Sequence, residues 1–220
     1  MYSAAIRFFF AVTLNRTMNY LQIPRVKVPK KLPVILSRDE VAELIAHSGS
    51  SKQKALMLIA YGSGLRASEI ANLKTKDIDS KAMRVFVRGG KGKKDRYTIL
   101  SENSLFALRD YWRRYHPKST EGYLFPGAKN VGSITREGVA YAVDNALSKT
   151  SIDKKASIHT LRHCFATHLL EDGYSLLQIK EMLGHASIHS TTIYLHLANT
   201  TSGVTSPADK LPEKFEDCAL

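Results

Sequence analysis

Apolar residues recur along most of the chain with the spacing of amphipathic helices. Near the N-terminus, Ile6, Phe9, Phe10 and Leu14 follow this period closely enough to predict one helix over residues 2–20. Glycine, proline and polar clusters separate the later apolar patterns, as expected at helix boundaries. The further predicted helices cover about residues 38–47, 55–61, 66–73, 102–115, 135–149, 159–171, 175–184 and 189–198.

Two of these helices carry a start signal. Ser37 is followed three residues later by Glu40, and Ser175 by Gln178. In a capping box the hydroxyl of the first residue binds a backbone N–H of the first turn, and the side chain three residues on binds back. Helices are therefore expected to begin just after Ser37 and Ser175.

One region has a strand pattern instead. Residues 83–88 and 96–100 are β-like, and the segment between them is rich in glycine and lysine. Two short strands with such a connection predict a β-hairpin. The expected fold is mainly α with a small antiparallel β-sheet of about three strands, an α+β class.

Composition narrows the class of protein. The 220 residues are 44% hydrophobic and 24% charged, which is ordinary for a globular chain and excludes wholesale disorder. Lys and Arg number 32 against 20 Asp and Glu, a net charge of +12. This excess indicates a polyanionic partner, with nucleic acid ahead of an acidic membrane surface.

Neither a membrane protein nor a secreted protein is predicted. The apolar run Phe8–Leu14 is far shorter than the roughly 20 residues of a membrane-spanning helix. It is followed by Asn15 and Arg16 rather than by a small-residue cleavage site. Two cysteines cannot form a disulfide framework. A transit peptide is a weaker alternative, and we expect a cytoplasmic protein.

The connection between the strands is the first candidate site. It is flexible and cationic, because glycines alternate with lysines and only Asp95 offsets the charge. It is either a solubilising loop or a finger that contacts phosphates, in which one lysine protonates a leaving oxygen. Its basic residues are Arg88, Lys91, Lys93, Lys94 and Arg96.

A second candidate lies at a helix entry. Arg66 follows Gly64 and precedes Glu69 by three residues. An arginine fork beside a helix N-terminus suits an anion. The alternative is a surface ion pair between Arg66 and Glu69.

The third candidate is the segment 159–168. His159 and Arg162 are three residues apart and so share a helix face. His159 and His163 also have the spacing of helical zinc ligands, but Thr160 stands where zinc peptidases have glutamate, so no metal is predicted. His163 and His168 are alternatively buried or capping histidines, an interpretation we favour for His168.

The fourth candidate is formed by His185 and Tyr194. Gly184 ends one predicted helix, and a short turn leads to the next, which carries Tyr194. Taken alone, the histidine is often a helix cap and the tyrosine packing.

Together the four candidates resemble the tyrosine recombinase (phage integrase) family in order and in rough spacing. The resemblance covers about residues 34–198. The matching residues are Gly64-Leu65-Arg66 with Ser68-Glu69-Ile70, Gly90-Lys91-Gly92, His159 with Leu161-Arg162-His163, Leu183-Gly184-His185, and Tyr194.

The resemblance implies a role for each residue. Tyr194 attacks a DNA phosphodiester and becomes joined to the 3′-phosphate. Arg66, Arg162 and His185 bind the non-bridging oxygens, and Lys91 protonates the 5′-oxygen. His159 assists proton transfer at the tyrosine, Glu69 holds Arg66, and His163 has a supporting place.

This chemistry needs neither a metal nor ATP, so no cofactor is expected. Two guanidinium forks meet the charge that gathers on phosphate oxygens. A phosphotyrosine link keeps the energy of the broken bond for rejoining. Two-metal nucleases instead need several converging carboxylates, which the sequence does not offer.

The resemblance also divides the chain into four segments. Residues 1–21 correspond to the last helix of a core-binding domain that is otherwise missing, and residues 22–33 to a basic linker. Residues 34–198 correspond to the catalytic domain, and residues 199–220 to a polar tail. The expected DNA contacts are Arg25, Lys27, Lys30, Lys31, Arg88, Lys93, Lys94 and Arg96.

The expected partners are double-stranded DNA and further copies of the chain in a synaptic tetramer, or a full-length recombinase. Such a protein would work at the bacterial nucleoid. Three alternatives stay open: a truncated integrase that only binds DNA, a type IB-like topoisomerase, and, most distantly, a zinc protein.

Overall fold

The computed structural model describes residues 2–16, 32–89, 95–117, 119, 121–128 and 131–198. It separates into two units, residues 1–32 and 33–220. Seven of the predicted DNA-contacting or catalytic cations lie outside the described residues: Arg25, Lys27, Lys30, Lys31, Lys91, Lys93 and Lys94.

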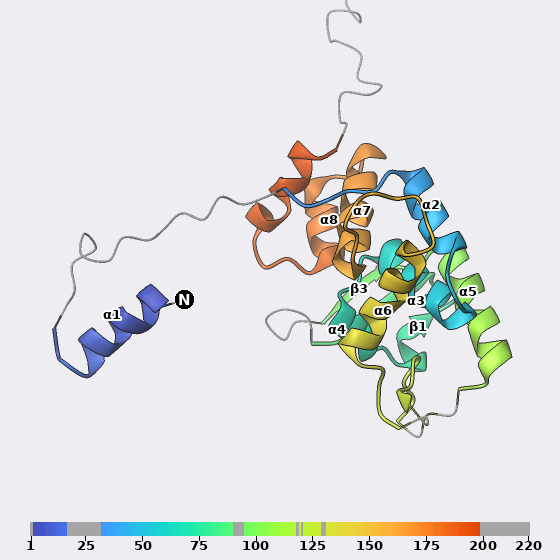
Figure 1. Ribbon diagram of the computed structural model, residues 1–220, viewed down its shortest axis with the longest axis horizontal. Helices are drawn as coiled ribbons and strands as arrows, with labels where there is room; N and C mark the ends of the chain where they lie inside the picture. The colour runs from blue at the N-terminus through green and yellow to red at the C-terminus, as the bar shows by residue number, and fades with distance from the viewer. Residues whose placement is uncertain are drawn as a thin grey trace, which may run out of the picture. The chain divides into compact units, whose positions relative to one another are not determined.

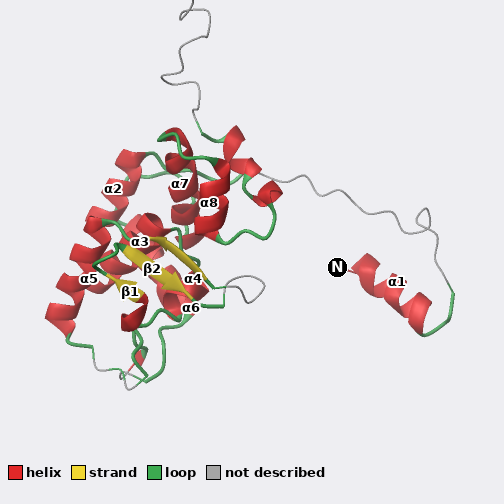
Figure 2. Cartoon of the chain, turned by 180° about the vertical axis from the view of Figure 1, so that it is seen from behind, coloured by secondary structure: helices red, strands yellow, loops and turns green. Residues whose placement is uncertain are grey.

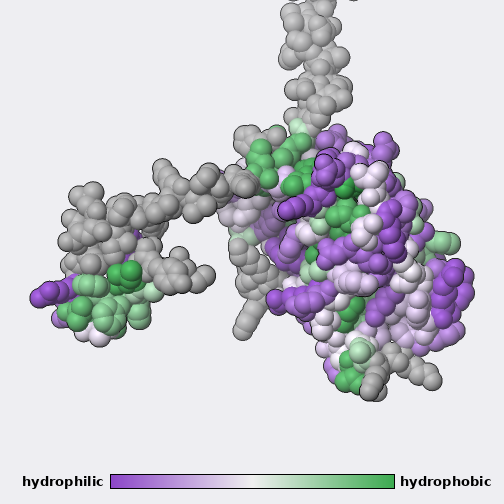
Figure 3. Space-filling model, in the orientation of Figure 1, coloured by the Kyte–Doolittle hydropathy of each residue, from purple (hydrophilic) through white to green (hydrophobic). Residues whose placement is uncertain are grey.

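The first unit contains helix α1, Tyr2–Val12. The prediction of a helix to residue 20 was wrong in its C-terminal part, since residues 13–16 are not helical. Asn15 has a φ of 45°, a left-handed conformation that a continuing helix does not contain. Phe8, Phe9 and Val12 are exposed, and α1 presents a largely hydrophobic surface in Figure 3.

The second unit is built mainly from helices (Figure 1). The capping boxes at Ser37 and Ser175 are both present, as predicted. The helices are α2 (Arg38–Ala46), α3 (Ser51–Ser63), α4 (Ala67–Ala71), α5 (Glu102–Tyr115), α6 (Arg136–Leu147), α7 (Ile158–Glu171) and α8 (Leu176–Leu183), with 3₁₀ turns η1 (Thr75–Asp77), η3 (Ile188–Ser190) and η4 (Thr192–His196).

The sheet has three antiparallel strands in the order β1 (Ile78–Asp79), β2 (Arg84–Val87) and β3 (Arg96–Ile99), drawn in yellow in Figure 2. In its register Val85 pairs with Thr98 and Val87 with Arg96. Val85, Val87 and Thr98 are buried, so this face of the hairpin turns inward. The predicted fold class, mainly α with a small antiparallel sheet, is confirmed.

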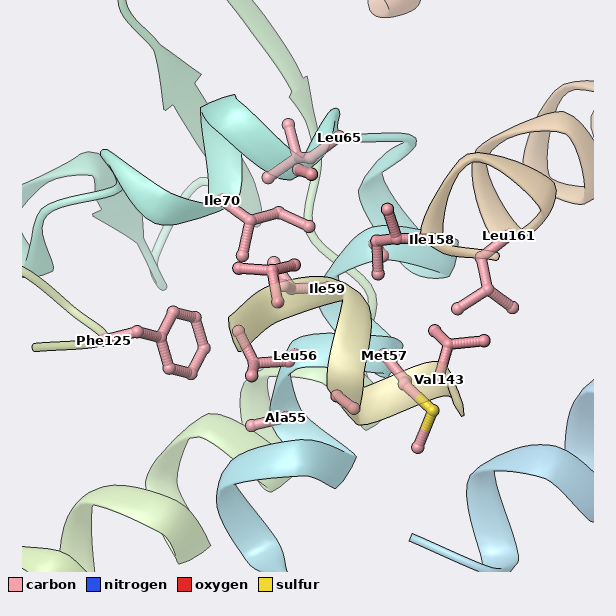
Figure 4. Packing of buried hydrophobic residues seen from close by; sticks show 14 of the residues in the cluster. Ala55, Leu56, Met57, Ile59, Leu65, Ile70, Phe125, Val143, Ile158 and Leu161 are labelled. Atoms are coloured by element: carbon pink, nitrogen blue, oxygen red, sulfur yellow. The ribbon is translucent and has the colours of Figure 1, made fainter. Parts of the chain in front are cut away.

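Helix α3 lies in the middle of the main hydrophobic core. It packs against α5, α6 and α7, and Figure 4 shows Leu56 and Ile59 of α3 among side chains from the surrounding elements. A smaller cluster joins Phe165 of α7, Leu183 of α8 and Tyr194 of η4. Helices α7 and α8 lie side by side in Figures 1 and 2, which brings the segments that carry the candidate residues together.

The segment 189–198 departs from its predicted form. It contains the 3₁₀ turns η3 and η4 rather than one α-helix. Thr191 and Thr192 are β-branched, which disfavours a continuous helix there. Within the described ranges, no helix combines the length and the apolar character that crossing a bilayer requires.

Candidate active site

The carboxylate of Glu69 is the centre of the site. It accepts hydrogen bonds from Arg66 Nη1 (2.7 Å), Arg96 Nη1 (2.9 Å) and Arg96 Nη2 (2.8 Å). Arg162 Nη1 lies 3.5 Å from Glu69 Oε2. The ion pair considered as an alternative for Arg66 and Glu69 does form, but the Glu69 side chain is 6% exposed, so the pair is not a surface one. Three guanidinium groups surround one buried carboxylate.

Local sequence places Arg66 and Glu69. Gly64 ends α3 with a φ of 62°, a left-handed conformation that favours glycine, and a Cβ there would lie 2.4 Å from the ring of Phe165. Arg66 is then the N-cap of α4, and its backbone N–H donates to Glu69 Oε2 at 2.8 Å. The turn into α4 therefore brings the side chains of Arg66 and Glu69 together.

Arg162 joins three segments of the chain. From α7 it donates through Nη1 to the carbonyl of Gly64 at 2.5 Å and through Nη2 to the carbonyl of Leu183 at 2.7 Å. Its side chain is 5% exposed. Burial and the nearby charge of Arg66 lower the pKa of Arg162 to about 10, which still leaves it charged at neutral pH.

Tyr194 lies between two histidines. Its hydroxyl is 3.1 Å from Nδ1 of His163, and its ring stacks on the ring of His185 with centroids 6.4 Å apart. His185 Nδ1 in turn lies 2.9 Å from the hydroxyl of Thr191. Tyr194 is 1% exposed, and burial raises the pKa of its phenol while Arg162 and Arg66 oppose that rise. The phenol is therefore protonated at neutral pH in this structure.

The histidines of the site are neutral at pH 7. Burial lowers the pKa of His163 to about 4, assisted by His159 and Arg162. Burial and the neighbouring arginines lower the pKa of His185 to about 4 as well. The pKa of His159 is lowered by partial desolvation and by the charges of Arg162 and Arg66. A neutral imidazole has one ring nitrogen free to accept a proton or hydrogen bond.

Unlike the neutral histidines, the carboxyl group of Glu69 is ionised at pH 7. Burial raises its pKa, but the hydrogen bonds and charge of Arg96, the Arg66 backbone and Arg162 outweigh burial and hold the pKa at about 2. The three guanidinium groups and this carboxylate leave two net positive charges in the cluster. A cluster of this charge suits an anion with several oxygens, such as a phosphodiester.

Most of the predicted site residues come together in this way. The structure brings together Arg66, Glu69, Arg162, His163, His185 and Tyr194. His159 lies close enough for the charges of Arg162 and Arg66 to lower its pKa. His168 is buried, as favoured from the sequence, with its Nδ1 2.8 Å from the hydroxyl of Tyr61.

Arg88 and Arg96 were both predicted to contact DNA, and in this structure both bind other side chains of the protein. Arg88 binds Asp77 and lies over the ring of Phe86. Arg96, which the sequence groups with the DNA contacts of the hairpin, binds acceptors within the protein in this structure. Its side chain is 8% exposed and its guanidinium is occupied by Glu69 and by the carbonyl of Met182, 2.7 Å from Nε.

A signal for Arg96 was present in the sequence. Side chains of a strand alternate between faces, so Arg96 shares the inward face with Thr98. Thr191, the partner of His185, gave no such signal. Among the described residues no group of three or more His, Cys, Asp and Glu side chains has the arrangement of a metal site.

Comparison with known proteins gives consistent matches. The model of the phage integrase family matches residues 35–201. The Sinorhizobium fredii protein y4qK, which carries a provisional integrase/recombinase name, is 44% identical over 211 residues, covering 95% of this chain and 68% of that protein.

Solved structures match as well. The crystal structure of XerA recombinase has a TM-score of 0.71 and 30% identity, covering 90% of this chain and 79% of XerA. XerH recombinase bound to its difH DNA substrate before cleavage has a TM-score of 0.71, covering 88% of this chain and 59% of XerH. Its identity of 23% makes it a match of fold alone.

Proposed function

The chain belongs to the phage integrase family and is a tyrosine-type site-specific recombinase, and from this membership we propose that it cuts and rejoins DNA through a covalent 3′-phosphotyrosine link, without metal or ATP. The observation that carries the proposal is the position of Tyr194 beside His163 and His185, next to the three-arginine cluster on Glu69.

The phosphate is held by the arginines. Arg66 and Arg162 bind the non-bridging oxygens of the scissile phosphodiester, and the neutral His185 donates a further hydrogen bond. As the phosphorus becomes five-coordinate, charge grows on those oxygens, and fixed guanidinium forks stabilise it more than they stabilise the ground state. His159 is on the same face of α7 as Arg162 and completes the set.

Cleavage is a transesterification. The Tyr194 oxygen forms a bond to phosphorus, and the bond from phosphorus to the 5′-oxygen breaks. The phenolic proton passes towards His163 Nδ1, and Lys91 protonates the departing 5′-oxygen. The reverse sequence, with the 5′-hydroxyl as nucleophile, rejoins the strand and frees Tyr194.

In this proposal His163 accepts the phenolic proton, a role in proton transfer that the family resemblance gave to His159. A neutral imidazole whose Nδ1 faces the hydroxyl can accept its proton, because Nε2 then carries the ring hydrogen. His159 is exposed and is better placed for the phosphate.

The proposal extends to the organisation of the chain and its partners. We take residues 34–198 as the catalytic domain, residues 22–33 as a basic linker, residues 1–21 as a helical segment outside that domain and residues 199–220 as a polar segment. The family match over 35–201 and the division of the structure after residue 32 support this scheme. The proposed partner is double-stranded DNA, and the proposed assembly is a synaptic tetramer of this chain or of this chain with a second recombinase; XerH, which shares the fold, is bound to its difH substrate.

A second candidate function follows from the burial of the nucleophile. Because Tyr194 is 1% exposed, attack on DNA needs η4 to shift, and a chain in which that shift does not occur would bind DNA without cutting it. This is the non-catalytic DNA-binding protein.

One experiment separates the two. A supercoiled plasmid carrying the DNA that flanks the gene is incubated with purified protein in EDTA, quenched with SDS, and examined for covalent protein–DNA adducts. The recombinase predicts an adduct that survives chelation and is lost in Tyr194→Phe. Retained DNA binding with no adduct favours the non-catalytic protein.

A further inference from the structure

Arg96 is a third arginine in the site, and it has no part in the proposed cleavage step. All three nitrogens of its guanidinium bind protein acceptors: Nη1 and Nη2 take the two oxygens of Glu69, and Nε takes the carbonyl of Met182. Three of the five N–H groups of Arg96 are therefore engaged inside the protein, and its side chain is 8% exposed.

Arg96 connects three parts of the chain that are far apart in sequence. It is the first residue of β3 and follows directly after the connection that contains Lys91. Its fork reaches α4 through Glu69 and the end of α8 through Met182, three residues before His185. A Cβ on Gly184 would lie 2.9 Å from Arg96 Cδ, so the glycine leaves the space that the arginine side chain fills.

We propose that Arg96 is a positioning residue that holds Glu69 and the turn before His185 in place, and so fixes the phosphate-binding geometry of Arg66 and Arg162. The inference rests on the proposed function, since it names the residue that keeps that site aligned. A lysine in its place retains the charge but cannot span both oxygens of Glu69 and the Met182 carbonyl.

The electrostatics support this role. Burial by itself raises the pKa of Glu69, and Arg96 is the leading cause that brings it down to about 2. Without Arg96 the carboxyl group would take up a proton at a higher pH. A protonated Glu69 loses its ion pair with Arg66 at 2.7 Å and releases that side chain from its fixed direction.

The test compares Arg96→Lys and Arg96→Gln with the control Arg84→Gln. Arg84 is a β2 arginine on the same hairpin and is also paired with a carboxylate, Asp79, but its side chain is 48% exposed and lies over Tyr97. Unfolding in urea establishes that each variant is folded. Inorganic phosphate is titrated and followed by NMR of the arginine side chains, and the adduct rate is measured at saturating protein from pH 4 to 8.

If Arg96 positions the site, both Arg96 variants bind phosphate at least about fivefold more weakly and form adduct at least about tenfold more slowly, with Arg96→Lys the milder. The acid limb of the rate profile moves to higher pH in Arg96→Gln, which a loss of stability alone does not produce. Arg84→Gln stays within about twofold of the parent on each measure.

A double-mutant cycle tests whether Arg96 acts on phosphate binding through Glu69. In a Glu69→Gln background, Arg96→Gln should add little further loss of phosphate affinity, because the contact through which it acts is already gone. Full additivity would overturn the proposal.

The outcomes of the two proposals are separable. Folded Arg96 variants with parental phosphate affinity and an unmoved acid limb overturn the positioning role, whatever the parent does to DNA. A parent protein that forms no adduct contradicts the proposed cleavage, and the phosphate titration then still decides the role of Arg96. A parent without saturable phosphate binding overturns the positioning role as well.

Discussion

The hydroxyl of Tyr194 lies 3.1 Å from Nδ1 of His163, one helical turn along α7 from His159. Both histidines share a face of that helix, but the one that meets the tyrosine is the one whose pKa is lowered to about 4 by burial, His159 and Arg162. The hydrogen bond thus pairs a neutral acceptor with a protonated phenol inside the smaller hydrophobic cluster.

Removing the hydroxyl tests the nucleophile. Tyr194→Phe should abolish the covalent adduct and leave DNA affinity within about twofold, because the ring still fills its place against Phe165 and Leu183. The lost hydrogen bond should lower the free energy of unfolding by about 1 kcal/mol. Adduct assays, DNA-binding assays and urea unfolding measure the three quantities. A collapse of DNA binding would mean that Tyr194 is structural and that the site is wrongly assigned.

Replacing Arg162 by lysine tests whether its positive charge is sufficient or whether the shape of the guanidinium group is also needed. Arg162→Lys should reduce the adduct rate by at least about 100-fold although the charge is kept, because one ammonium group does not reach the carbonyls of Gly64 and Leu183 as the guanidinium does. The control is Arg114→Lys, an exposed arginine paired with Asp110 on α5. Near-parental cleavage by Arg162→Lys would refute its role at the phosphate.

Acid should destabilise the fold through the buried histidines. The pKa values of His163 and His185 are about 4, below the ordinary value of about 6.5. Between pH 6.5 and 4 the unfolded chain therefore binds more protons than the folded one, and stability falls as the pH falls through that window. After allowance for partial exposure, the loss is on the order of 1 kcal/mol for each histidine.

Urea unfolding at pH 7, 6, 5 and 4 measures this dependence. His163→Gln should flatten part of the slope, since one of the two titrating groups is then absent. Glu69, with a pKa of about 2, contributes stability that is lost only as the pH falls below about 4.5, so the two effects separate. An identical slope in the variant would contradict the assigned pKa of His163.

A pair of glycine variants tests whether the space that Gly184 leaves for the Arg96 side chain is needed. Gly184 and Gly173 both have positive φ, 64° and 87°, so alanine at either position is strained by about 1 kcal/mol. Only at Gly184 would the new Cβ meet Arg96, at 2.9 to 3.1 Å, whereas nothing lies within 4 Å at Gly173. Gly184→Ala should therefore slow adduct formation more than Gly173→Ala at comparable stability. Equal rates would mean that the fit around Arg96 is not important.

The sequence by itself determined the elements and the members of the site. Helix α5 falls at residues 102–115 as predicted, and the capping boxes at Ser37 and Ser175 form as the residue types require. These features are local, because apolar periodicity, caps and glycine turns act over a few residues. The order of the motifs also predicted the family, because each motif is short and carries a recognisable chemistry.

Only the tertiary structure decided how those residues meet. Arg96 and Glu69 are 27 residues apart, and Arg162 and Gly64 are 98 apart, so no local pattern joins them. The packing of α7, α8 and β3 turned Arg96 inward and set His163 rather than His159 against Tyr194. Burial alone would favour the protonated form of Glu69, and its carboxyl group stays ionised because the closed core holds three guanidinium groups around it.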